Sequence, residues 1–119
     1  MTGYQQYKEQ SVQTMTQSEL LILLFDELTK RLLRSEIALK HENFDVFEAS
    51  VDKSREIIQY LKETLDHNYE ISNELKRMYD FFLYELILLK AGRKQEIIEE
   101  LKVLVKDLRD AFFQASMEV

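Results

Sequence analysis

Turn-forming residues are almost absent from this chain, and this restricts its fold more than any other feature. Among 119 residues there is no proline, and the only glycines are Gly3 and Gly92. β-Sandwiches and doubly wound α/β folds need many tight turns, which rely on these residue types. Because 45% of the residues are hydrophobic, the composition is that of a globular protein rather than a disordered one. These observations leave a single all-α domain.

Start and stop signals divide the chain into helices. Thr16-Gln17-Ser18-Glu19 has the form of a capping box, in which the Thr16 hydroxyl and the Glu19 carboxylate each accept a backbone N–H of the other. Asn43 is a natural N-cap for a second helix, and Gly92 fits the left-handed position after a third. The spacing predicts helices over about 17–40, 44–66, 70–91 and 93–116, preceded by an N-terminal arm, 1–15.

Each predicted helix carries one apolar stripe with i, i+3, i+4, i+7 spacing, and no segment alternates convincingly as a strand. Short connections make consecutive helices antiparallel, so the prediction is an antiparallel four-helix bundle. The predicted core residues are Leu20, Leu24, Leu28, Leu32, Ala38 and Leu39; Phe44, Phe47, Val51, Ile58, Leu61 and Leu65; Ile71, Leu75, Met78, Phe82, Leu86 and Leu89; and Ile97, Leu101, Leu104, Leu108, Phe112 and Ala115.

The helices carry more apolar surface than one core stripe requires. At about 100° per residue, a second set of apolar side chains lies away from the stripes of the first three helices. One interpretation is that an asymmetric bundle buries some helices on two sides. The other is that these side chains line grooves for a partner's helices, or an interface between copies of the chain. The candidate groove residues are Ile22, Leu33, Ile37, Val46, Tyr60, Phe81, Tyr84 and Leu88.

The arm has four apolar residues, Tyr4, Tyr7, Val12 and Met15, in a segment otherwise rich in Gln, Thr and Ser. Such a segment has too little apolar area to fold alone, but two aromatic rings can anchor it in a neighbouring groove. We expect the arm to cover a groove when no partner is bound. The alternative is a disordered tail.

Several functional classes are disfavoured by composition. The absence of cysteine removes disulfides and thiolate metal sites. A net charge of −6 and the absence of an evident basic cluster argue against a nucleic-acid partner. His41 and His67 fall in predicted loops, and neither has the preceding glutamate of a di-iron bundle. We therefore expect no catalytic site, metal or cofactor, and a function in binding.

Two observations concern the cellular compartment. Residues 1–20 carry polar Gln and Thr where a signal peptide needs an apolar run. The longest apolar run, Leu20 to Phe25, is too short to span a bilayer. We expect a cytoplasmic protein that does not insert into membranes.

Five segments in order resemble the FliS family of flagellar secretion chaperones. They are Tyr4-Gln5-Gln6-Tyr7 in the arm, Ser18 to Asp26 in the first helix, Ser54-Arg55-Glu56-Ile57-Ile58 with Leu61 and Thr64-Leu65-Asp66 in the second, Leu75 with Met78-Tyr79-Asp80-Phe81 in the third, and Leu108-Arg109-Asp110 with Phe112 in the fourth. Each motif alone is weak, but together they cover nearly the whole chain.

The resemblance implies an ATP-independent chaperone that binds the disordered C-terminal segment of flagellin in apolar surface grooves. Binding blocks premature polymerisation and keeps flagellin competent for flagellar type III secretion. The cytoplasmic domain of the export gate is a second implied partner, and the arm would cap a groove or contact that gate. A homo-oligomeric structural or adaptor bundle, including a homodimer, remains the alternative.

Overall fold

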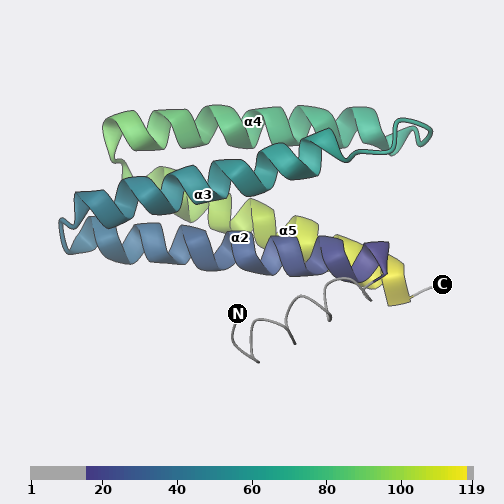
Figure 1. The fold of residues 1–119 in the computed structure, drawn as a ribbon, viewed down its shortest axis with the longest axis horizontal. Coiled ribbons are helices and arrows are strands. Elements are labelled where there is room, and N and C mark those ends of the chain that lie inside the picture. Colours follow the sequence, from purple (N-terminus) through teal and green to yellow (C-terminus); the bar gives the residue numbers. More distant parts are fainter. Residues whose placement is uncertain (1–15, 118–119) are drawn as a thin grey trace, which may run out of the picture.

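The computed structural model describes residues 16–117, which form four α-helices and no strand (Figure 1). The helices are α2 (Gln17–Lys40), α3 (Phe44–Glu63), α4 (Ile71–Gly92) and α5 (Gln95–Met117). Consecutive helices run in opposite directions, as their short connections require (Figure 1). The predicted all-α antiparallel four-helix bundle is confirmed.

The helices are not equally enclosed. α2 packs extensively against both α3 and α5, whereas α4 packs mainly against α3 and only weakly against α5. α4 therefore lies at the edge of the bundle and leaves a long face uncovered by the described residues (Figure 1).

Ion pairs between helices accompany the antiparallel register. Lys90 Nζ lies 2.9 Å from Asp52 Oδ1 and joins α4 to α3. Lys102 Nζ lies 3.2 Å from Oε1 of the buried Glu36 and joins α5 to α2. The Lys90–Asp52 pair is partly exposed, so it contributes little to stability and chiefly favours one register over a slipped one.

Large apolar side chains from all four helices form the core. Phe25, Phe47 and Phe82 are completely buried, and such burial stabilises by about 1.5–3 kcal/mol for each side chain. The predicted core residues that the structure buries are Leu28, Leu32, Ala38, Phe47, Val51, Ile58, Leu61, Leu75, Phe82, Leu86, Leu89 and Leu101. Half-buried residues at the margin of this core are Leu20, Leu24, Leu39, Phe44, Leu65, Ile97, Leu104, Leu108 and Phe112.

Three core predictions were wrong. Ile71 and Met78 are exposed on α4, where Tyr79 is buried instead, and Ala115 is exposed on α5. Apolar residues occupy adjacent positions on these helices, so two overlapping stripes fit a helical spacing equally well. Contact with the neighbouring helices decides which stripe is buried. On α5 the fully buried residues are Ile98, Leu101 and Val105.

The helix starts follow the predicted capping chemistry. The Glu19 N–H donates to Thr16 Oγ1 at 3.2 Å, and the Thr16 N–H donates to Glu19 Oε2 at 3.4 Å, so the capping box is present. The Val46 N–H donates to Asn43 Oδ1 at 3.4 Å and caps α3. Both predicted N-caps are therefore confirmed.

The end of α3 comes earlier than the predicted residue 66. After Glu63 the Leu65 N–H bonds to the Lys62 carbonyl, a tighter turn than the helix makes. Asp66 then accepts from the Asn68 N–H at 3.0 Å, which turns the chain toward α4.

The predicted role of Gly92 was wrong. Gly92 is the last helical residue of α4, and the left-handed position belongs to Arg93, with φ of 54°. The Arg93 N–H donates to the Leu89 carbonyl at 2.8 Å, and its guanidinium lies 3.7 Å from the centre of the Phe44 ring. The hydrogen bond and the cation–π contact offset the cost of that backbone conformation.

Candidate binding surfaces

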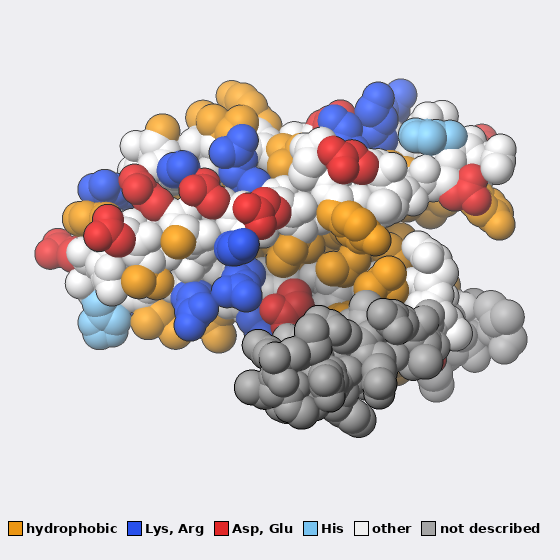
Figure 2. Space-filling view, in the orientation of Figure 1, with side chains coloured by type: hydrophobic (Ala, Val, Ile, Leu, Met, Phe, Trp, Pro, Cys, Tyr) orange, Lys and Arg blue, Asp and Glu red, His pale blue; other side chains and the backbone are white. Residues whose placement is uncertain are grey.

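The groove beside the α2–α3 turn collects three of the predicted groove residues. Leu33 and Ile37 lie one helical turn apart on α2, and Val46 faces them from the first turn of α3. The groove has a volume of about 500 Å³ and is open to solvent. Figure 2 shows hydrophobic side chains gathered at the end of the molecule where this turn lies. We call it the α2–α3 groove.

A second apolar surface lies on the exposed side of α4. Phe81, Tyr84 and Leu88 follow one another at i, i+3 and i+7, so they share one helix face, and all three are exposed. Met78 and Ile87 are exposed beside them. Hydrophobic side chains are visible along the outer edge formed by α4 in Figure 2. We call these five residues the α4 face.

The other two predicted groove residues have different surroundings. Tyr60 lies in a groove between α3 and α4 whose lining is largely polar and includes Asp52, Arg55 and Lys90. Arg55 Nε is buried there and has no hydrogen-bond partner within residues 16–117. Ile22 is half-buried. The arm residues Tyr4, Tyr7, Val12 and Met15 lie outside the described residues.

Basic side chains line the α2–α3 groove, although the sequence analysis found no basic cluster. Lys30 and Arg34 are one helical turn apart on α2, and His41 follows at the end of the same helix. No acidic side chain is among the residues that line this groove. The i, i+4 spacing of Lys30 and Arg34 indicates in the sequence that both cations lie on one face of the helix. The negative net charge of the whole chain gives no indication of this local cluster.

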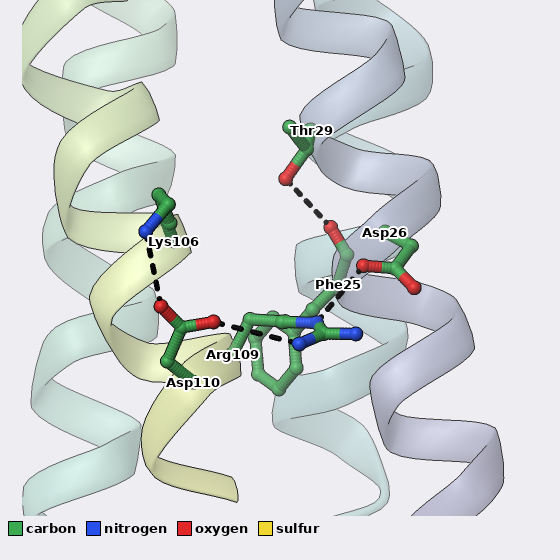
Figure 3. Close-up of polar contacts among 6 residues, drawn as sticks. All are labelled: Phe25, Asp26, Thr29, Lys106, Arg109 and Asp110. Atoms are coloured by element: carbon green, nitrogen blue, oxygen red, sulfur yellow. Dashed lines mark hydrogen bonds and ion pairs between the residues drawn. The ribbon is translucent and has the colours of Figure 1, made fainter. Parts of the chain in front are cut away.

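The second and fifth family-like segments, Ser18 to Asp26 and Leu108 to Phe112, meet in space. Arg109 Nε on α5 donates to Asp26 Oδ1 on α2 at 3.1 Å (Figure 3). The Phe25 and Phe112 rings stack with centroids 5.5 Å apart. A hydrogen bond from Lys106 is the main cause that lowers the pKa of the exposed Asp110 carboxyl, which also contacts Arg109. The Arg109–Asp26 hydrogen bond and the Phe25–Phe112 stack hold α5 against α2 and have a structural role.

Within residues 16–117, no three or more His, Asp or Glu side chains gather in a way that could hold a metal ion. No helix in the same range has the length and apolar character needed to cross a membrane.

The arrangement of these helices is similar to that of a protein of known structure. It is similar to a solved structure described as a flagellar chaperone from bacteria, with a TM-score of 0.84 over 98% of this chain and 96% of that one. Sequence identity to that structure is 18%, so this similarity concerns the fold alone.

Sequence comparison identifies the family. The model of the family "Flagellar protein FliS" matches residues 1–119. The flagellar secretion chaperone FliS of Bacillus subtilis (strain 168) is 30% identical over 112 residues, which are 94% of this chain and 84% of that protein. The chain belongs to the FliS family, and the resemblance seen in its motifs is confirmed.

Proposed function

We propose that this protein is a flagellar export chaperone whose client is flagellin. The observation that carries the proposal is the exposure of large apolar side chains on a well-packed bundle. Seven of the eight predicted groove residues are exposed, including Tyr84 at 58% and Ile37 at 50%. Apolar surface on this scale is unfavourable for an isolated soluble domain and is typical of a protein–protein interface.

The proposed mechanism is helix-in-groove binding coupled to folding of the client. The C-terminal segment of flagellin, disordered in the monomer, would wrap around the bundle as helical turns. One turn would enter the α2–α3 groove and another would lie along the α4 face. Burial of apolar area on both partners supplies the binding free energy, so no nucleotide hydrolysis is required. The same burial hides the flagellin surface that polymerises. The chaperone would bind its client in the cytosol, before export.

The arm and the export gate complete the proposal. Tyr4 and Tyr7 would anchor the arm in a groove of the empty chaperone, so that the client must displace it. Deletion of residues 1–13 should then tighten client binding. If the arm contacts the cytoplasmic domain of the export gate instead, the deletion should leave client affinity unchanged and block secretion.

The test is a calorimetric titration of the full chain with a peptide of the flagellin C-terminal segment. The proposal predicts a one-to-one complex, a gain of helical circular dichroism and a negative heat-capacity change from apolar burial. Absence of binding at peptide concentrations up to about millimolar, which corresponds to roughly 4 kcal/mol, would contradict it.

A second candidate function is a homo-oligomeric adaptor, favoured by the uncovered α4 face. Two copies that pair through Phe81, Tyr84 and Leu88 would bury the same surface without a client. Sedimentation at several concentrations separates the candidates. An oligomer that dissociates on dilution and does not bind the peptide would favour the adaptor.

A further inference from the structure

We infer that the α2–α3 groove selects an amphipathic helix that carries acidic residues beside its apolar anchors. The inference rests on the proposed function, since it takes the groove to be a helix-binding site. It goes further by assigning a charge rule to that site, with Lys30 and Arg34 as the residues that determine specificity.

The charge around the groove differs in sign from that of the whole chain. The chain as a whole has a net charge of −6, yet the groove lining combines Leu33, Ile37 and Val46 with basic side chains and no acidic one. Glu42 and Asp45 are close in sequence but do not line the groove. An apolar strip with one sign of charge at its rim is complementary to a helix with the opposite sign at its flanks.

Lys30 and Arg34 are only weakly engaged by ion pairs within the described part of the chain. Arg34 is exposed and makes no ion pair with any described residue. Lys30 Nζ lies 3.5 Å from Glu27 Oε1, but its side chain is 72% exposed, so the contact is weak and easily exchanged. The cations of cross-helix pairs, such as Lys102 with the buried Glu36, are by contrast already engaged. Arg34 and Lys30 are thus available to a partner.

The arm and a second copy of the chain fit this groove less well than an acidic helix does. Residues 1–15 of this chain contain one lysine and one glutamate, Lys8 and Glu9, so the arm offers no acidic excess. A second copy docked symmetrically through this groove would bring two basic rims together, which is unfavourable. An acidic amphipathic helix satisfies both the apolar strip and the rim.

The experiment uses the full chain and three designed helical peptides with the same apolar face. Their flanking positions carry Glu, Gln or Lys, and binding is measured by fluorescence anisotropy at low and high salt. The expected order is Glu over Gln over Lys, with each step about three- to tenfold at low salt and smaller at high salt. Arg34→Glu should abolish most of the preference for the Glu peptide over the Lys peptide, because the new carboxylate offsets the charge of Lys30. The matched control Lys94→Glu adds the same charge at an exposed site outside the groove and should leave the order unchanged.

Two further measurements locate the site and separate the claims. Ile37→Asn should weaken all three peptides alike, since the apolar anchor is shared. Equal affinity of the three peptides at low salt, no binding of the Glu peptide, or equal effects of Arg34→Glu and Lys94→Glu would overturn the inference. Binding of the flagellin peptide is measured in parallel. If that peptide binds while no charge order is found, the charge rule fails and the proposed function stands. If it does not bind, the proposed function fails, and the order of the designed peptides still decides the charge rule.

Discussion

Arg109 and Asp26 are 83 residues apart in the sequence, and their side chains hydrogen-bond at 3.1 Å across the α2–α5 interface. The Asp26 side chain is 46% exposed, so solvent screens the pair and its net contribution should be about 0.5–1 kcal/mol. We predict a coupling free energy of that size in a double-mutant cycle with Asp26→Asn and Arg109→Gln. Chemical denaturation of the four proteins measures it, and additive effects would show that the pair does not stabilise the fold.

The capping box gives a second prediction. Thr16→Ala removes the acceptor for the Glu19 N–H and should lower the free energy of unfolding by roughly 1 kcal/mol. Thr16→Ser keeps the hydroxyl and should be nearly neutral, so it serves as the control. An unchanged denaturation midpoint for the alanine variant would mean that α2 does not depend on this cap.

Gly92 gives a prediction of the opposite sign. It lies in the last turn of α4 with an ordinary helical backbone, and an added β-carbon would meet only the Lys94 side chain, at 3.9 Å. Gly92→Ala should therefore stabilise the protein by about 0.4–1 kcal/mol, mainly by restricting the unfolded chain. The thermal midpoint measures this, and a decrease would show that Gly92 needs conformations that alanine disfavours.

Tyr79 gives a prediction about alkaline pH. Its hydroxyl group is on a ring that is 1% exposed, and desolvation by burial raises its pKa to about 12 from the ordinary 10.0. Burial favours the neutral phenol over the phenolate. The contribution of Tyr79 to the free energy of unfolding is therefore complete below pH 10 and is lost as the pH rises toward 12. Tyr79→Phe should remove this part of the decline in stability between pH 10 and 12. Denaturation of both proteins across that range tests it, and parallel pH profiles would contradict the assignment.

The bundle and its helix starts could be predicted because they depend on local chemistry. The Thr16 capping box and the Asn43 N-cap each form between a side chain and a backbone N–H three residues away. The position of Leu33, Ile37 and Tyr84 on a second apolar face also followed from angular position on one helix, whereas the sequence left their exposure open. These features need no knowledge of the neighbouring helices.

Other features could not be predicted because they depend on contacts between distant segments. Tyr79 and Met78 are adjacent and both apolar enough for a core, and the packing of α4 against its neighbours decides which of the two is buried. Arg93 takes the left-handed backbone in place of Gly92, and its guanidinium contacts Phe44 on another helix, a contact that local sequence does not reveal. The basic rim of the α2–α3 groove could not be predicted from the net charge of −6, because Lys30 and Arg34 are a small part of an acidic chain.

The central claim is that the exposed apolar side chains bind the client and do not hold the fold. Its most direct test is the affinity of the flagellin C-terminal peptide for Leu33→Asp and Leu88→Asp, measured with their thermal stability. Each aspartate would face an apolar client helix, so affinity should fall by about ten- to a hundredfold while the unfolding midpoint changes little. Gln114→Asp adds the same charge at an exposed site and should bind normally, and Leu86→Ala, in the core, should lose about 2–5 kcal/mol of stability. Unchanged peptide affinity in both aspartate variants, together with a large loss of stability, would contradict the account.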